Sequence, residues 1–199
     1  MAMFCLAAGS ACAASVDVQV LGSDGKPLAG AAVFLESPAA RAAIKPISGT
    51  EIEQAARRFT HRLTVVPVGS EIQFPNRDSV RHHVYSFSPT KSFELKLYGG
   101  NASNPVLFDK SGIAVLGCNI HDNMVAWVVV VETPYYGQTD ATGSVRLDAV
   151  PAGSFRLRTW HPGLPPGEPA ANEALTLSAA GAKATVKLPL TAAMAAAGS

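Results

Sequence analysis

The chain of 199 residues carries little charge, and the two signs nearly cancel. Sixteen Lys and Arg stand against fifteen Asp and Glu, so the formal net charge is +1. Without a basic field, we expect no binding to nucleic acid. The chain also lacks a long apolar run, because residues 126–131 supply only about a third of the roughly 20 apolar residues that a membrane-spanning helix needs. We therefore expect no membrane span.

Cysteine is scarce as well, and two of the three cysteines, Cys5 and Cys12, lie near the start. Residues 1–14 are uncharged and apolar and end in an Ala-x-Ala pattern at residues 11–13, which is typical of a secretory signal peptide. A buried N-terminal helix and lipid attachment at Cys12 are the two alternatives for this segment. We expect the mature protein to be periplasmic or secreted.

Removal of residues 1–14 leaves Cys118 as the only cysteine, so no internal disulfide is expected. A free thiol is a liability in an oxidising compartment, and metal ligation would explain its presence. Cys118, His121 and Met124 recur at intervals of three within the short segment 117–124. If this segment forms a tight loop, the three side chains turn toward one point and offer three metal ligands.

A fourth ligand has to come from another strand, and His82 and His83 are the two candidates. A thiolate, a thioether and two imidazoles form a soft donor set that favours copper, because methionine is not a usual ligand of zinc. In a strand, His82 and His83 point to opposite faces, so only one of them can face the other ligands. The residues alone leave both candidates open.

Glycine and proline punctuate short apolar runs along the chain, which is typical of strands joined by turns. We therefore expect an all-β protein. Alternating or short apolar runs predict strands at residues 16–20, 31–35, 63–68, 71–74, 82–87, 93–97, 113–116, 125–131, 145–149, 155–158 and 185–190. The first two strands are expected to form a hairpin. One helix is predicted at residues 50–58, where Thr50 and Glu53 match a capping box.

Residues 63–131 resemble a cupredoxin, the small blue-copper fold of plastocyanin and amicyanin. The resemblance lies in residues 65–74, in the sequence at residues 82–84, in residues 108–112 and in the ligand spacing of residues 118–124, which is that of amicyanin. Chains built in this way are often labelled methylamine utilization proteins. The resemblance implies a Greek-key β-sandwich or barrel with one type 1 copper site. The ligands that it implies are His82, Cys118, His121 and Met124.

Two departures from the cupredoxin pattern concern the loops. His83 stands where the family has an asparagine that ties the two ligand loops together, and Ile120 and Asp122 replace prolines of the amicyanin loop. Four protein ligands leave no open position, whereas catalytic metal sites keep one. We therefore expect an electron carrier and not an enzyme, with the edge of His121 as the exit for the electron that the resemblance implies. Its partner would be a redox protein, such as a dehydrogenase, a cytochrome or an oxidase.

The flanks resemble a second family, the carboxypeptidase regulatory-like module, in residues 25–31 and 139–157. This resemblance implies a smaller transthyretin-like or immunoglobulin-like β-sandwich, into which we predict that the copper domain is inserted. Two tandem domains are the alternative. The predicted parts are a sandwich at residues 15–40 and 133–190, a cupredoxin domain at residues 41–132 and a disordered tail at residues 191–199.

Two other functions stay open on the sequence alone. The first is a periplasmic copper-delivery protein, and the second is a β-sandwich that binds glycan or protein and has a structural copper site. Among the other residues, His61 is expected to be solvated and Trp127 to belong to the core. A second copper site near His161 is not expected, because too few histidines remain to complete it. The redox partner, pathway, potential and oligomeric state stay undetermined.

Overall fold

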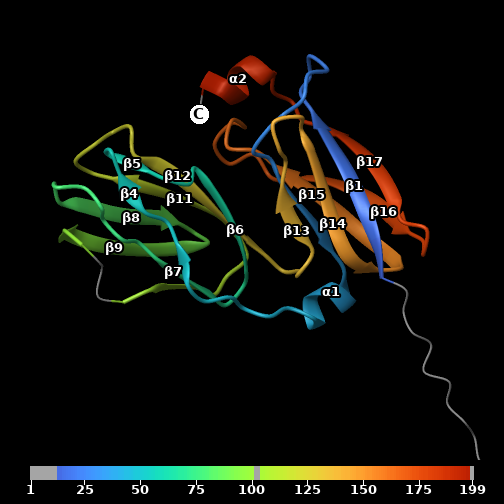
Figure 1. The fold of residues 1–199 in the computed structure, drawn as a ribbon, viewed down its shortest axis with the longest axis horizontal. Coiled ribbons are helices and arrows are strands. Elements are labelled where there is room, and N and C mark those ends of the chain that lie inside the picture. The colour runs from blue at the N-terminus through green and yellow to red at the C-terminus, as the bar shows by residue number, and fades with distance from the viewer. Residues whose placement is uncertain (1–12, 101–103, 198–199) are drawn as a thin grey trace, which may run out of the picture.

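The computed structural model describes residues 13–100 and 104–197, and it confirms the predicted all-β class, with strands broken only by two short helices. Two bodies of strands lie side by side, one formed by β1, β2 and β13 to β17 and the other by β3 to β12, whose bounds are given below (Figure 1). In the described residues, no helix has the length and hydrophobicity needed to cross a membrane. Most of the predicted signal segment lies outside the described residues, and Ala13 and Ala14 begin β1.

The first body consists of a three-stranded and a four-stranded sheet. The three-stranded sheet has the order β14 (Ser144–Pro151), β1 (Ala13–Leu21) and β17 (Ala182–Lys187). The four-stranded sheet has the order β13 (Tyr136–Gln138), β2 (Ala32–Glu36), β15 (Gly153–Trp160) and β16 (Ala171–Leu177). Strands β1 and β2 thus pair with strands that follow residue 132.

The predicted hairpin of residues 16–20 and 31–35 is wrong, because β1 and β2 lie in different sheets. Four of the five residues of β2 are buried, so both faces of this strand are covered. β2 lies in the interior of its sheet, between β13 and β15. β1 instead buries alternate residues, with Val16, Val18 and Val20 inside and the residues between them outside.

The second body holds the remaining strands. Its five-stranded sheet has the order β6 (Leu63–Pro67), β12 (Val125–Val131), β11 (Gly112–Cys118), β8 (His82–Ser88) and β9 (Lys91–Tyr98). A three-stranded sheet has the order β10 (Val106–Phe108), β7 (Ser70–Gln73) and β3 (Thr50–Glu51). A small hairpin joins β4 (Gln54–Ala55) to β5 (Arg58–Phe59).

The helix predicted at residues 50–58 is wrong, since this segment forms β3, β4 and β5. The local capping signal is overridden by tertiary contacts. Ile52 is fully buried in the core, and its N–H donates to the carbonyl of Gln73 at 2.9 Å. A continuous helix would break this pairing with the edge of β7.

Each of the two helices follows a strand of the first body, α1 after β2 and α2 after β17. Ser37 caps α1 (Pro38–Ala42) by accepting from the N–H of Ala40 at 3.1 Å. The tail at residues 191–199 was predicted to be disordered, but its residues 192–197 form α2 (Ala192–Ala197). The hydroxyl of Thr191 accepts from the N–H of Met194 at 3.2 Å, so Thr191 supplies a cap that the sequence pattern did not reveal.

The apolar core forms two clusters, and the five-stranded sheet contributes to both. On β12, Val128 and Val130 belong to the cluster of the second body, whereas Val129 and Val131 belong to that of the first. This division follows from the alternation of side chains along a strand. The sheet that carries the candidate ligands is therefore packed on both sides over part of its length.

Candidate metal centre

Three of the predicted ligands come from neighbouring ends of β8 and β11. His82 is the first residue of β8, Cys118 is the last of β11, and His121 lies in the loop that follows β11. Cys118 lies opposite Val84 in the antiparallel register. His82 precedes Val84 by two residues, so His82 and Cys118 point to the same face of the sheet.

The ligand atoms of His82, Cys118 and His121 all lie within 4.8 Å of one another. The Nδ1 atom of His82 is 3.8 Å from the Sγ atom of Cys118, and the two imidazole centroids are 5.0 Å apart at an interplanar angle of 58°. His82 and Cys118 are buried, while His121 is half-buried at the edge of the group. No other group of this kind occurs among the residues that the structure describes.

The Nδ1 atom of His121 is buried and has no hydrogen-bond partner in the described structure. A buried polar atom without a partner costs free energy, and such atoms call for an explanation. A metal ion held between His121, Cys118 and His82 would supply the missing partner. The two imidazoles and the thiolate form a soft donor set, so these residues fit copper.

Met124 is 1% exposed and belongs to the same buried cluster as Cys118. Its N–H donates to the carbonyl of His121 at 2.9 Å, which closes the ligand loop just before β12 begins. The loop is therefore tight, as the spacing of three residues required. The role of Met124 as the fourth ligand stays a prediction.

His83 is not part of the group, although the sequence left it open as a ligand. Its ring lies 2.8 Å from the carboxylate of Glu94 and meets the ring of Tyr85 edge to face. Tyr85 in turn lies opposite Gly117 in the register of β8 and β11. His83 thus faces the opposite side of the sheet from His82, as strand alternation requires.

Asp78 contacts His82 from the side away from Cys118, and no sequence argument singled it out. Its Oδ2 atom lies 2.7 Å from the Nε2 atom of His82, and its carboxylate also accepts from the N–H groups of Ala56 and Arg57 at 2.7 and 2.9 Å. Burial opposes ionisation, but the hydrogen bonds from Arg57, His82 and Ala56 outweigh it, so the pKa of Asp78 lies below its usual value. The carboxylate is therefore the stable form.

Tyr98 is a second neighbour that the sequence did not indicate. It lies opposite His82 in the register of β8 and β9, and its hydroxyl donates to the carbonyl of Phe74 at 2.6 Å. Burial raises the pKa of Tyr98 to about 12, although the hydrogen bond from the amide of Gln54 opposes the rise. The hydroxyl therefore keeps its hydrogen and acts as a fixed donor beside the site.

The two remaining histidines show no ligand character. His161 is buried, its Nε2 atom lies 3.0 Å from the carbonyl of Ala29, and its Nδ1 atom accepts from the N–H of Gly163 at 2.9 Å. Both ring nitrogens are thus used within the protein. His61 is exposed, as its position in the sequence predicted.

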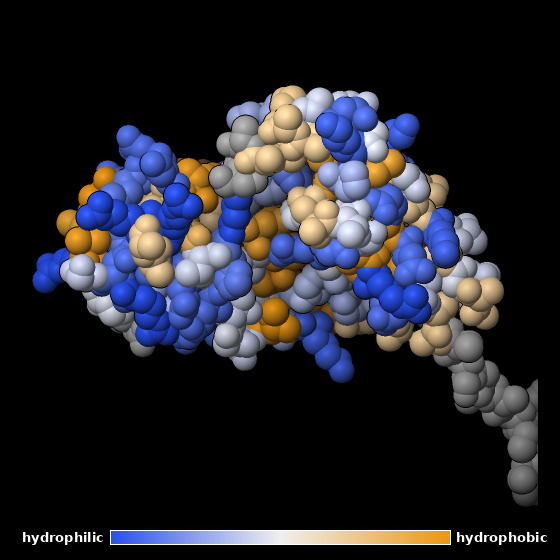
Figure 2. Space-filling model, turned by 45° about the horizontal axis from the view of Figure 1, so that its top comes forward, coloured by the Kyte–Doolittle hydropathy of each residue, from blue (hydrophilic) through white to orange (hydrophobic). Residues whose placement is uncertain are grey.

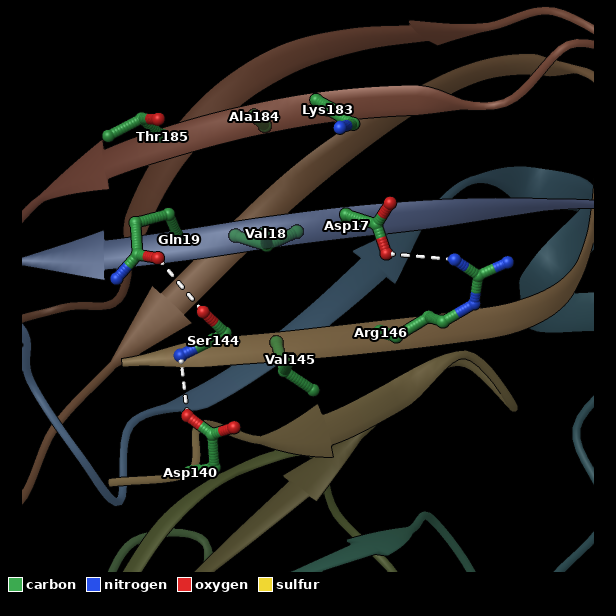
Figure 3. A pocket seen from close by; sticks show the side chains of 10 residues that line it. All are labelled: Asp17, Val18, Gln19, Asp140, Ser144, Val145, Arg146, Lys183, Ala184 and Thr185. Atoms are coloured by element: carbon green, nitrogen blue, oxygen red, sulfur yellow. Dashed lines mark hydrogen bonds and ion pairs between the residues drawn. The ribbon is translucent and has the colours of Figure 1, made fainter. Parts of the chain in front are cut away.

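The outer face of the three-stranded sheet holds a shallow cavity of about 450 Å³ (Figure 3). Its polar side chains contact one another: Gln19 accepts from the hydroxyl of Ser144 at 2.9 Å, and Arg146 pairs with Asp17 at 3.1 Å. No aromatic ring lines this cavity, so it offers no surface on which a sugar ring could stack. Nothing in this cavity favours the glycan-binding alternative.

The loop that carries His121 is flanked by exposed apolar side chains. Ile120 is 47% exposed and Val125 is 39% exposed. Hydrophobic surface is visible at the end of the second body that lies farthest from the first body (Figure 2). A half-buried imidazole within an apolar rim is accessible to another protein.

No protein-family model matches the chain, and no curated protein is significantly similar to it. Among solved structures, the copper-containing nitrite reductase from Thermus scotoductus SA-01 is 21% identical over 44% of this chain and 23% of that chain, with a TM-score of 0.40. The match thus spans less than a quarter of the nitrite reductase.

Two other solved structures are also similar to part of the chain. The purple cupredoxin from Nitrosopumilus maritimus is 21% identical over 41% of this chain and 99% of its own, with a TM-score of 0.37. A Cu(I) form of an amicyanin variant is 24% identical over 51% of this chain and 99% of its own, with a TM-score of 0.38.

Proposed function

We propose that this chain is an exported type 1 copper protein that carries single electrons between redox partners. The proposed ligands are His82, Cys118, His121 and Met124. The observation that carries the proposal is the convergence of two imidazoles and the only cysteine of the described residues on one point, where the Nδ1 atom of His121 is buried without a partner. Bound copper would supply a one-electron couple between Cu(I) and Cu(II).

The protein's own contribution is a rigid set of donors. Two of the proposed ligands, His82 and Cys118, sit on adjacent paired strands, and the other two lie in a loop closed by the hydrogen bond between Met124 and His121. Strand pairing limits how far these donors can move when the charge of the site changes. A closed ligand set leaves no position for a substrate, which favours electron transfer over catalysis.

The half-buried ring of His121 is the proposed exit for the electron. The exposed residues Ile120 and Val125 beside it offer a small apolar contact, and Asp122 adds a negative charge at the rim. Redox partners meet through small and weak interfaces, for which such a rim is suited. We propose a dehydrogenase, a cytochrome or an oxidase as the partner.

The chain arrangement that we propose is an inserted copper domain. Residues 15–40 and 133–190 would form the carboxypeptidase regulatory-like sandwich, and residues 41–132 would form the cupredoxin domain. The pairing of β1 with β14 and of β2 with β15 supports this division. Export to the periplasm or beyond the cell is proposed on the residues of the N-terminal segment.

The test is metal addition to the purified chain. Cu(II) should bind at one equivalent and produce an intense visible charge-transfer band, which Cys118→Ser should abolish. His61→Ala is the matched control, because this exposed histidine lies outside the group, and it should keep the band. A chain that binds Cu(II) without the band would refute the type 1 site. A partner that removes the copper faster than it exchanges electrons would favour copper delivery instead.

A further inference from the structure

The hydrogen bond between Asp78 and His82 decides which ring nitrogen of His82 faces the site. An ionised carboxylate only accepts hydrogen bonds, so the Nε2 atom of His82, 2.7 Å from Oδ2 of Asp78, must carry the hydrogen. In the neutral ring, the Nδ1 atom, 3.8 Å from Sγ of Cys118, then carries the lone pair and directs it into the group. Only this tautomer can ligate a metal beside Cys118.

Asp78 is itself held by the hairpin that joins β4 to β5. Its Oδ1 atom accepts from the N–H of Ala56 and its Oδ2 atom accepts from the N–H of Arg57. These two residues form the turn, and both have positive φ values, 51° and 57°. Such two-residue turns prefer Asn-Gly, because alanine and arginine are strained in the left-handed region. The carboxylate thus satisfies two donors of a turn that the local sequence does not favour.

The loop before β8 is organised to present Asp78. Asn76 is buried, and its amide donates to the carbonyls of Val80 and Tyr98 at 2.8 and 2.9 Å. Its Oδ1 atom accepts from the N–H of Asp78 at 2.9 Å. The position of the carboxylate is therefore fixed by the backbone on one side and by the hairpin on the other.

We propose that Asp78 is a positioning residue of the copper centre, which fixes the tautomer and orientation of His82 and lowers the reduction potential of the bound metal. The inference rests on the function proposed above. Metal-binding histidines depend on such partners, whose loss changes metal affinity or activity by about 10- to 100-fold. A negative charge one hydrogen bond from the ligand favours Cu(II) over Cu(I), so its removal should raise the potential.

The first experiment compares Asp78→Asn with the wild-type chain by redox titration of the visible band at one pH. Asparagine keeps the size and an accepting oxygen but removes the charge. We expect the equilibrium to shift about tenfold toward Cu(I), which is about 59 mV for one electron. An unchanged potential in Asp78→Asn would overturn the proposal.

Glu94→Gln is the matched control, because Glu94 contacts the neighbouring His83 at 2.8 Å on the opposite face of the sheet. The same loss of charge there should shift the equilibrium less than about twofold, since the side chain of Glu94 is 44% exposed and screened by solvent. A shift as large as that of Asp78→Asn would mean that net charge, and not the bond to His82, sets the potential.

The second experiment needs no copper. Nitrogen-15 NMR of the imidazoles in the metal-free chain, read at a pH at which the ring of His82 is neutral, should show the hydrogen of His82 on Nε2 in the wild type and a mixture of tautomers in Asp78→Ala. His82 with its hydrogen on Nδ1 would refute the proposal. If the expected tautomer is found but Cu(II) gives no visible band, the positioning of His82 stands and the proposed function fails.

Discussion

The Nδ1 atom of His82 lies 3.8 Å from the Sγ atom of Cys118, although 36 residues separate the two in the chain. The pairing of β8 with β11 produces this contact, because Cys118 lies opposite Val84 and shares its face with His82. The adjacent His83 lies against Glu94 on the other face. The two histidines are therefore unequal in what they can bind.

The first prediction follows from this difference. His82→Ala should abolish the visible band of the Cu(II) form, whereas His83→Ala should keep it and leave the reduction potential nearly unchanged. Cu(II) titration followed by visible absorption measures both. If His83→Ala loses the band and His82→Ala keeps it, with both folds intact by circular dichroism, the assignment of the two histidines is reversed.

The sequence predicted some of these features because they are local. Cys118, His121 and Met124 lie within one short segment, so their spacing alone indicated a common site. The choice between His82 and His83 was not local, because alternation along a strand does not tell which face is inside. The structure brings together His82, Cys118 and His121, and their role as ligands stays a prediction.

The features that the sequence did not predict depend on contacts between distant segments. Asp78 is one of many acidic residues until the loop around Asn76 and the turn at Ala56 bring donors to it. The capping pattern at residues 50–58 favoured a helix, but the burial of Ile52 against the core decided for strands. Local propensity loses to tertiary packing in such short segments.

The second prediction concerns the close contact between Gly117 and Tyr85. A Cβ atom at residue 117 would lie 2.8 Å from Cζ and from the hydroxyl oxygen of Tyr85. Gly117→Ala should therefore lower the free energy of unfolding by about 1–3 kcal/mol, as overpacking does elsewhere. Urea unfolding of the metal-free chain measures this loss. The double variant with Tyr85→Leu should recover much of it, and equal losses in both would contradict the steric explanation.

The third prediction concerns the turn at Ala56 and Arg57, whose positive φ values are costly for these residues. Ala56→Asn combined with Arg57→Gly supplies the preferred Asn-Gly pair. The free energy of unfolding should rise by about 1 kcal/mol, the order of the strain that is removed. The reduction potential should stay the same, because both N–H groups that contact Asp78 are kept. If the reduction potential of the double variant differs from that of the wild type, the turn affects the site through more than the two N–H groups that contact Asp78.

The fourth prediction concerns pH. Burial lowers the pKa of His161 from its ordinary value of 6.5, the nearby charge of Arg62 lowers it further, and the hydrogen bond to Ala29 opposes both. The unfolded chain therefore binds a proton at a higher pH than the folded chain does. The stability contributed by neutral His161 is complete above pH 6.5 and falls as the pH drops below it.

His161→Gln tests this dependence, because it removes the titrating group and keeps a polar side chain. Urea unfolding of the metal-free chain at several pH values below 7 should show a smaller fall in stability for the variant than for the wild type. The matched control is His61→Gln, which changes an exposed histidine and should keep the wild-type slope. Identical slopes for His161→Gln and the wild type would contradict the role of His161.

The last prediction follows from the sheet that contributes to both cores. Val128 and Val129 are adjacent on β12 but pack into different clusters, so neither cluster can lose its packing without exposing this strand. Calorimetry of the metal-free chain should therefore show one unfolding transition.

Copper binds only the folded state under the proposed function. A concentration of Cu(II) about 100 times its dissociation constant should therefore raise the free energy of unfolding by about 2.7 kcal/mol, and the chain should still unfold in one transition. Val129 packs into the core cluster of the first body, so Val129→Ala should lower the temperature of the same transition. Two separate transitions, of which copper raises only one, would show instead that the two bodies unfold independently.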